Sequence, residues 1–196
     1  MNPNWGIEVI DNFVSPSYLK EIGQSLDPQL MQWHFRESQS LSKTPSLEDF
    51  GFAIGLCGDG SRYQPKGFYD TKICTFMRPL IYQIKDYIGA STIVRSRLDL
   101  TILHKQKYIH PPHTDISYKQ SIEKNYVSAI VYINDTDGDT VIYDHNAPPP
   151  YPTNMKIKKT IAPKPGRLLL FDARYVHTGH SPSEHQTRIL LNTVLL

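Results

Sequence analysis

The spacing of hydrophobic and polar positions changes near residue 92 of this chain. Between residues 72 and 88 apolar side chains recur every three or four positions, which predicts a helix, and Gly89 follows as a stop. Pro79 lies inside the pattern, so it either kinks the helix or marks its first turn near Arg78. We interpret the apolar stripe as core packing rather than as a cofactor site.

The N-terminal part predicts one more helix and little regular structure besides. After a short strand at residues 6–10, Ser15 and Pro16 offer an N-cap and a first helical residue for a helix that runs through Leu26. Residues 36–72 are rich in Ser, Gly, Asp and Pro and predict a long connection with one short strand at 52–56. Connections of this length are usually functional or disordered.

Beyond residue 92 the period is that of β-strands. The predicted strands are residues 93–103, 126–133, 140–143, 156–161, 167–171 and 187–196. Residues 135–139 predict a hairpin turn, and Lys164-Pro165-Gly166 predicts a type II turn. The pattern predicts a mainly β (α+β) fold, a sandwich or jelly roll with the helices packed on one outer face.

The length of 196 residues suits a single domain, with residues 1–92 as helical support and substrate-loop region and residues 93–196 as the β core. Such a barrel binds ligands inside, so we expect the long segments 36–72 and 144–155 to lie across its mouth. Four prolines stiffen the second segment: Pro148, Pro149, Pro150 and Pro152.

Composition narrows the expected cellular location and partners of the protein. Cys57 and Cys74 are the only cysteines, too few for a disulfide framework, so two free thiols in a reducing compartment are expected. A net charge of +2 with dispersed basic residues predicts no nucleic-acid partner. No apolar run has the length of a membrane span, and Met1–Trp5 lacks the features of a secretory signal. We therefore expect a cytoplasmic protein without a membrane partner.

Candidate chemistry is concentrated in His113-Thr114-Asp115, followed 62 residues after Asp115 by His177 and then by Arg188. Residues i and i+2 of a strand point to the same side, so His113 and Asp115 can face one ion. Two imidazoles and one carboxylate are a typical ligand set for non-haem Fe(II) with open positions, which indicates oxygen chemistry. Chance alone predicts about 0.5 His-x-Asp triplets in this composition, so the triplet gains weight only from the residues that follow it.

Two other histidines are alternatives at this site. His180 could compete with His177 as the third ligand, and we favour His177 because residues 164–172 predict a turn and strand that lead directly to it. His110, three residues before the first ligand, could contact a substrate, although we expect it on the rim.

Several motifs together resemble one family. They are His113-Thr114-Asp115, Ala129-Ile130-Val131-Tyr132-Ile133-Asn134, Asp137-Gly138-Asp139-Thr140, Pro165-Gly166-Arg167 through Phe171-Asp172, His177 and Thr187-Arg188. In order and spacing the chain resembles the Fe(II)- and 2-oxoglutarate-dependent dioxygenases, in their prolyl 4-hydroxylase-like branch. The resemblance covers about residues 93–196 and implies a double-stranded β-helix, the jelly roll expected above.

The resemblance implies roles for individual residues. His113, Asp115 and His177 would ligate Fe(II), and Arg188 would pair with the distal carboxylate of 2-oxoglutarate, helped by the hydroxyl of Tyr132. A guanidinium offers a planar fork of donors that matches a carboxylate, and the apolar neighbours of Arg188 indicate a buried residue rather than one on a strand surface. O2 is the second cosubstrate, with ascorbate in a supporting role.

One family feature is missing. A tyrosine often stands nine or ten residues before the first ligand in this family, where this chain has Leu103 and His104. Tyr108 or His104 are the candidates to replace its contact with the cosubstrate.

The resemblance also implies the reaction, hydroxylation of an unactivated C–H bond by a 2-oxoglutarate-dependent Fe(II) dioxygenase. The first expectation for the substrate is a protein or peptide side chain such as proline, and the alternative is a free amino acid or small metabolite. A non-catalytic metal-binding β-helix module and a zinc hydrolase with the same ligands are alternatives of another class. Oxygenases that repair alkylated DNA carry a second arginine shortly after the cosubstrate arginine, and residues 189–196 contain no basic residue.

Overall fold

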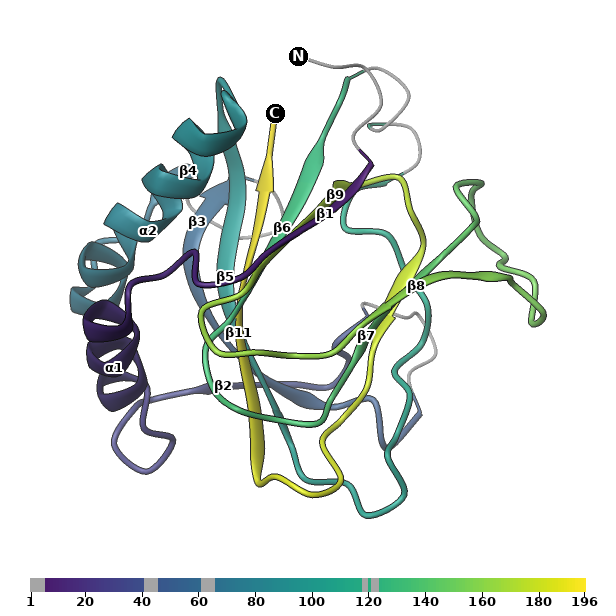
Figure 1. Ribbon diagram of the computed structural model, residues 1–196, viewed down its shortest axis with the longest axis horizontal. Helices are drawn as coiled ribbons and strands as arrows, with labels where there is room; N and C mark the ends of the chain where they lie inside the picture. Colours follow the sequence, from purple (N-terminus) through teal and green to yellow (C-terminus); the bar gives the residue numbers. More distant parts are fainter. Residues whose placement is uncertain (1–5, 41–45, 61–65, 118–119, 121–123) are drawn as a thin grey trace.

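Two antiparallel sheets face each other in the computed structural model, which describes residues 6–40, 46–60, 66–117, 120 and 124–196 (Figure 1). The large sheet has the order β1 (Ile7–Ile10), β9 (Leu168–Asp172), β6 (Val127–Tyr132), β11 (Thr187–Leu195), β5 (Ile93–Ile102), β3 (Gly51–Asp59) and β2 (His34–Arg36), with β4 (Lys66–Phe68) paired to β3. The small sheet has the order β10 (His177–Gly179), β7 (Thr140–Tyr143) and β8 (Ile157–Ile161). This arrangement confirms the predicted mainly β jelly roll.

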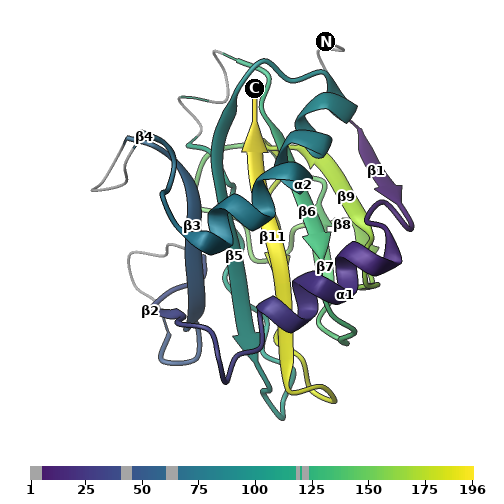
Figure 2. The same ribbon diagram turned by 90° about the vertical axis from the view of Figure 1, so that its left-hand side faces the viewer.

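The helices α1 (Pro16–Ser25) and α2 (Lys72–Ile88) lie on the outer face of the large sheet, away from the small one (Figure 2). The side chain of Ser15 caps α1 by accepting a hydrogen bond from the N–H of Tyr18, as predicted. α2 begins after its N-cap Thr71 and continues through Pro79, so the alternative of a first turn near Arg78 is wrong. Gly89 ends the helix in the left-handed conformation, as predicted.

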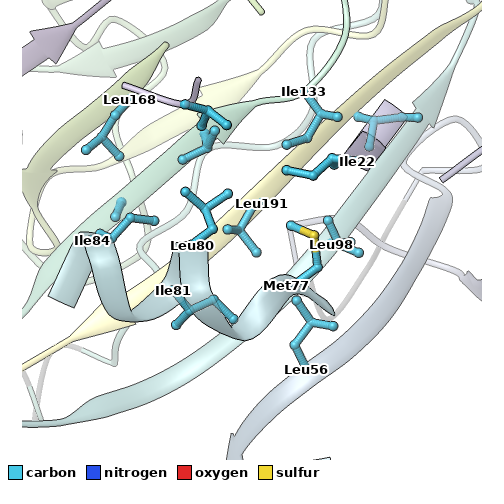
Figure 3. Packing of buried hydrophobic residues seen from close by; sticks show 14 of the residues in the cluster. Ile22, Leu56, Met77, Leu80, Ile81, Ile84, Leu98, Ile133, Leu168 and Leu191 are labelled. Atoms are coloured by element: carbon cyan, nitrogen blue, oxygen red, sulfur yellow. The ribbon is translucent and has the colours of Figure 1, made fainter. Parts of the chain in front are cut away.

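The main hydrophobic core lies between α2 and the large sheet (Figure 3). Met77, Leu80 and Ile84 of the helix pack over Leu98 of β5 and Leu191 of β11, and all five side chains are fully buried. Burial of a large apolar side chain contributes about 1.5–3 kcal/mol, so this layer fixes the central strands firmly. The apolar stripe of residues 72–88 therefore packs the core, as interpreted from the sequence.

The predicted long strands are confirmed to within one or two residues at each end. The short strands β2, β4 and β10, of three residues each, were not predicted, and β3 is longer than the predicted 52–56. The type II turn at Lys164-Pro165-Gly166 is confirmed, because Gly166 has φ +77° and the N–H of Arg167 donates to the carbonyl of Lys164 at 2.9 Å.

The predicted hairpin at residues 135–139 is wrong. β6 and β7, which this segment connects, belong to different sheets, so the segment crosses from one sheet to the other. The carboxylate of Asp137 accepts hydrogen bonds from the backbone N–H groups of Ser183, Glu184 and His185. These bonds attach the crossing segment to a distant loop and fix its position. They replace the ladder of hydrogen bonds that a hairpin would form.

Strand alternation gives the large sheet a dry face and a polar face. On β5, Leu98 and Leu100 point into the helix-side core, whereas Arg97, Asp99 and Thr101 line a cavity between the sheets. The first 92 residues add β1 at one edge of the sheet and β3 and β2 at the other. Segments 1–5, 41–45 and 61–65, with the predictions made for them, lie outside the described residues. No described helix has both the length and the apolar character needed to cross a membrane.

Candidate metal centre and its cavity

A cavity opens between the two sheets, and two of the three predicted metal ligands, His113 and His177, line it. The full lining is Gln39, Arg97, Asp99, Thr101, His110, His113, Ile130, Thr140, His177, Thr178, Gly179, Arg188, Leu190 and Asn192. These residues come from both sheets, from the segment before β3 and from the segment after β5. The wall carries far more polar and charged side chains than the helix side of the same sheet.

His113, Asp115 and His177 come together at this wall, with one possible ligand atom from each lying within 4.8 Å of the others. His177 begins β10, whereas His113 lies on an irregular segment that makes isolated β-bridges, one from Ile109 to His180 and one from His113 to His177 itself. The i, i+2 arrangement of His113 and Asp115 was predicted for a β-strand. It occurs here on an extended segment that does not form a full ladder of hydrogen bonds with a neighbouring strand. His180 is outside the cluster, so the choice of His177 over His180 agrees with the geometry.

Both histidines present the same ring nitrogen to the cluster. Nδ1 of His113 lies 3.2 Å from the carbonyl of Pro111, and Nδ1 of His177 lies 3.2 Å from the carbonyl of Tyr175. A carbonyl only accepts, so each Nδ1 carries the proton and each Nε2 lone pair is left for a metal ion. The backbone two residues before each histidine therefore selects the tautomer.

The carboxylate of Asp115 is held from three strands. Its Oδ1 accepts from Arg95 of β5 at 3.0 Å and from Asn192 of β11 at 3.4 Å, and its Oδ2 accepts from Ser128 of β6 at 2.7 Å. Oδ2 also lies 3.6 Å from Nε2 of His177. Oδ2 keeps a lone pair for a metal ion, and the orientation of the carboxylate is set before an ion arrives.

The electrostatics favour the protonation states that bind a cation. Burial, with repulsion from His177, lowers the pKa of His113 to about 3. Burial alone would raise the pKa of Asp115, but the nearby positive groups, His177 and Arg95 first among them, together outweigh it and hold the pKa below its ordinary value. Neutral His113 and ionised Asp115 are the forms that ligate a divalent metal, so the donor set fits Fe(II).

Arg188 lies in the same cavity at the start of β11, and only 6% of its surface is exposed. Its Nε donates to the carbonyl of Gly138 at 2.7 Å, and its Nη2 donates to Oγ1 of Thr140 at 2.9 Å. Nη1 makes no hydrogen bond to the described residues and remains available to an anion. A Cβ added to Gly138 would lie 2.6 Å from Cδ of Arg188, so glycine is required for this approach.

Tyr132 supports this site without lining the cavity. Its face of β6 points inward, and its hydroxyl donates to Oγ1 of Thr140 at 2.7 Å. Thr140 thus accepts from both Tyr132 and Arg188, which leaves its own hydroxyl proton free to donate into the cavity. Burial raises the pKa of Tyr132, so the phenol stays a donor. The sequence assigned the contact to Tyr132, and Thr140, the residue that lines the cavity, was missed.

The candidates for the missing family tyrosine do not line the cavity. The hydroxyl of Tyr108 bonds to Ser46, and His104 pairs with Glu48. The geometry therefore does not bring the predicted cosubstrate contact of Tyr108 into the site. Thr101, on β5 before this segment, lines the wall instead.

His110 is buried in the cavity wall rather than on the rim where it was expected. Its Nδ1 lies 2.8 Å from Oδ1 of Asp49 and its Nε2 lies 3.0 Å from the hydroxyl of Ser181. Asp49 also accepts from Ser38 and Ser40. These bonds hold the segment before β3 against the metal centre, and Gln39 of this segment reaches the cavity.

The two long segments have different positions. Part of segment 36–72 lies at the cavity through Gln39, as predicted. None of residues 144–155, all of them described, lines it, and the β7–β8 connection projects to the side in Figure 1. The expected cover from the proline-rich segment is therefore wrong. Residues 146–149 and Tyr151 instead border a separate depression with Thr114 and Arg174.

A polar row on β5 was also missed by the sequence analysis. Arg97, Asp99 and Thr101 line the cavity at alternate positions of the strand. This pattern could have been read from the sequence. Polar residues at every second position of an otherwise apolar strand indicate a polar face, whereas both faces of a buried central strand are usually expected to be apolar.

Comparison with known proteins gives a family and a fold. Residues 100–195 match the model of the 2OG-Fe(II) oxygenase superfamily. No curated protein is similar enough in sequence to be matched.

Solved structures share the fold at low sequence identity. A Trichoplax adhaerens prolyl hydroxylase in complex with a hypoxia-inducible factor peptide fragment has a TM-score of 0.65 and 16% identity, over 97% of this chain and 83% of its own. The α-ketoglutarate-dependent epimerase SnoN from nogalamycin biosynthesis has a TM-score of 0.64 and 13% identity, over 98% and 79%. A Pseudomonas putida prolyl-4-hydroxylase has a TM-score of 0.56 and 14% identity, over 97% and 92%.

Proposed function

We propose that the protein is a hydroxylase that uses Fe(II), 2-oxoglutarate and O2 to oxidise an unactivated C–H bond, since residues 100–195 match the model of the 2OG-Fe(II) oxygenase superfamily. The observation that supports this most is a buried guanidinium, that of Arg188, in the same cavity as the cluster His113, Asp115 and His177. A metal-only module or a zinc hydrolase has no use for that guanidinium.

The three ligand residues would hold Fe(II), which supplies the redox chemistry and the coordination positions for the reaction. The backbone carbonyls of Pro111 and Tyr175 fix the tautomers of the two histidines. Arg95, Ser128 and Asn192 orient the carboxylate of Asp115. Such supporting contacts typically change metal affinity or activity 10- to 100-fold when removed.

Arg188 would bind the distal carboxylate of 2-oxoglutarate through Nη1 and the free hydroxyl proton of Thr140. Nε and Nη2 are already held by Gly138 and Thr140, so the guanidinium is oriented before the anion arrives. A charge-assisted hydrogen bond in a buried site contributes about 1.5–3 kcal/mol.

The apolar part of the wall would exclude water around the reacting groups. Ile130 and Leu190 lie between the metal cluster and Arg188 on the strands β6 and β11, and both are buried. Water exclusion strengthens every electrostatic contact in the cavity and prevents side reactions.

The substrate has two candidate classes, and hydroxylation itself is part of the proposal. The neighbour that holds a peptide fragment supports the expectation of a peptide side chain such as proline. The epimerase among the neighbours belongs to a fold that carries more than one reaction, so fold alone does not choose the chemistry.

The test is consumption of 2-oxoglutarate by the purified protein with Fe(II), ascorbate and O2, followed as succinate. We expect slow succinate formation without a substrate and faster formation with the correct one. Asp115→Asn should abolish both, whereas Arg78→Gln, on α2 at the opposite face of the sheet, should change neither. Absence of succinate from iron-loaded protein across peptide and metabolite pools would reject the proposal.

A further inference from the structure

The cavity contains a second buried arginine, Arg97, that the metal centre and the Arg188 site leave unused. Arg97 lies on β5 directly opposite Asn192, the residue that holds the metal-ligand carboxylate of Asp115. Its Nε donates to Oδ2 of Asp99 at 2.9 Å, and its side chain is 13% exposed, toward the cavity. Its two terminal nitrogens make no hydrogen bond to the part of the chain that the structure describes. Four N–H donors are thus available to a ligand.

Positive and negative groups are both present around Arg97. The guanidiniums of Arg36, Arg95 and Arg97 lie near the carboxylates of Asp99 and Asp115, and Asp49 also acts on Arg36. Asp99 is shared, because Arg36 lies 3.6 Å from its Oδ1. Burial, followed by repulsion from Arg97, lowers the pKa of Arg36 to about 10. Burial alone would also lower the pKa of Arg97, but Asp99 and Asp115 together raise it, so Arg97 stays charged. An anion would therefore be bound by the N–H donors of Arg97 that no described residue occupies.

We assign Arg97 to a different anion from the cosubstrate held by Arg188. Arg188 pairs with Thr101 across the sheet and Arg97 pairs with Asn192, so the two arginines start from backbone positions that are four strand residues apart. At about 3.3 Å a residue this is roughly 13 Å along the strand. The carbon chain of 2-oxoglutarate, with four bonds of about 1.5 Å each, spans at most about 6 Å, which is shorter than the separation of these backbone positions.

Four buried polar atoms of the cavity wall have no hydrogen-bond partner within the described structure, and two of them belong to Asn192, opposite Arg97, and to Asp99, its ion-pair partner. Thr101 Oγ1 and Gln39 Nε2 can donate, and Asn192 Oδ1 and Asp99 Oδ1 can only accept. Each of the four residues lines the cavity and is at least nine-tenths buried. An unsatisfied buried polar atom costs about 1–3 kcal/mol, so these atoms indicate a polar ligand with both acceptor and donor groups.

From this arrangement we infer that Arg97 is the anchor for a carboxylate of the substrate, and that the substrate is a small free acid that also carries an N–H or O–H group, such as an amino or hydroxy acid. This inference rests on the proposed hydroxylase function and chooses the small-molecule alternative over a peptide side chain. A residue inside a peptide has no free carboxylate at its own backbone. The fork of Arg97 would bind the acid, and Asn192 and Asp99 would accept from the donor group.

The experiment screens free amino acids and 2-hydroxy acids one by one, each beside its own carboxamide, with iron-loaded protein and 2-oxoglutarate. We expect at least one acid to accelerate succinate formation tenfold or more and to gain 16 Da, while its carboxamide does neither. Arg97→Gln should then raise the KM for that acid by about 10- to 150-fold, the loss expected for charge-assisted hydrogen bonds, without changing the KM for 2-oxoglutarate. Arg97→Lys should give a smaller increase because the fork is lost and the charge kept.

Two controls keep this test decisive. Arg97→Gln leaves Asp99 buried without its closest partner, so the variant Arg97→Gln/Asp99→Asn, which removes both charges, is measured beside it for thermal stability and iron content. Calorimetric binding of the acid to metal-free protein gives a readout apart from turnover. Arg78→Gln should leave binding and KM unchanged.

The possible failures are distinguishable. Acceleration by carboxamides or internal peptides instead of acids would overturn the role of Arg97 and leave the hydroxylase proposal intact. A rise in the KM for 2-oxoglutarate in Arg97→Gln, with no change for the acid, would do the same. Substrate-independent succinate formation without acceleration by any acid would also overturn it. A complete lack of succinate would reject the hydroxylase proposal itself.

Discussion

His113 and His177 are joined through both of their backbone hydrogen bonds. The N–H of each donates to the carbonyl of the other at 2.9 Å, and the two ring centroids lie 4.5 Å apart. This one bridge sets the distance between the first and third ligands, although the segment of His113 belongs to no strand. Since peptide groups fix it, the pair should keep its spacing when either side chain is changed.

Asp115→Asn should therefore remove the metal and keep the fold. The amide cannot supply the negative charge that a divalent ion requires, yet its shape preserves most contacts with Ser128 and Asn192. We expect loss of stoichiometric iron, measured by metal analysis after desalting, with a cooperative thermal transition retained. Asp115→Ala should be less stable, because it removes the carboxylate that accepts from Arg95, Ser128 and Asn192. Full iron content in Asp115→Asn would contradict the ligand assignment.

Arg188→Gln should weaken 2-oxoglutarate binding by about 10- to 150-fold, which corresponds to about 1.5–3 kcal/mol for a charge-assisted contact. Arg188→Lys should recover only part of this, because a lysine cannot hold Gly138 and Thr140 and the anion together. The measurement is the KM for 2-oxoglutarate from succinate formation, with metal content as the control. Equal KM values in wild type and Arg188→Gln would remove Arg188 from the site.

Gly138→Ala should weaken 2-oxoglutarate binding by displacing Arg188, without a direct contact between residue 138 and the anion. The new Cβ would meet the carbonyl of His180 at 2.5 Å and Cδ of Arg188 at 2.6 Å, so the arginine must move. We expect a KM for 2-oxoglutarate raised at least about tenfold and about 1–3 kcal/mol of lost stability from overpacking. Gly23→Ala is the matched control, because its Cβ meets nothing within 4 Å and alanine favours the helix by about 0.5–1 kcal/mol. A KM unchanged in Gly138→Ala would show that Arg188 tolerates displacement.

Much of the fold could be predicted because period and capping are local properties. The helix at residues 72–88 and the long strands follow from side-chain spacing, and the turn at Gly166 follows from the φ that only glycine adopts easily. The three-residue strands β2, β4 and β10 are too short to show a period. The crossing at residues 135–139 depends on bonds from Asp137 to residues 183–185, and no local pattern contains that information.

The candidate site also has residues that could be predicted from the sequence and residues that could not. His113, Asp115, His177 and Arg188 could be found because their chemistry and order are distinctive, and the structure gathers all four at one cavity. Thr140 could not, because its importance comes from accepting two hydrogen bonds whose donors are remote in sequence. The proline-rich segment was misplaced because proline content predicts stiffness but not direction.

Metal-free protein should lose stability as the pH falls from 7 to 5, and His113 should account for a defined part of the loss. The pKa of this histidine is about 3 in the folded chain and about 6.5 in the unfolded chain. Between these values the unfolded state binds the extra proton, so the free energy of unfolding decreases as the pH is lowered. At about 1.4 kcal/mol per pKa unit, His113 should contribute at most about 2 kcal/mol of loss between pH 7 and pH 5.

The range from pH 7 to pH 5 distinguishes the stability change caused by His113 from the changes caused by carboxylates. The pKa of Asp115 is also lowered, but the stability that an acid with a depressed pKa contributes is lost only below its ordinary value of about 4. His180 has a lowered pKa from burial and acts in the same direction, so the comparison must be made between variants. Urea unfolding in the presence of a chelator should show a shallower pH dependence for His113→Gln than for wild type. If stability depended on pH in the same way in both proteins, the imidazole of His113 would not be held neutral in the folded chain. The metal centre would then lack the deprotonated ring nitrogen on which its metal affinity depends.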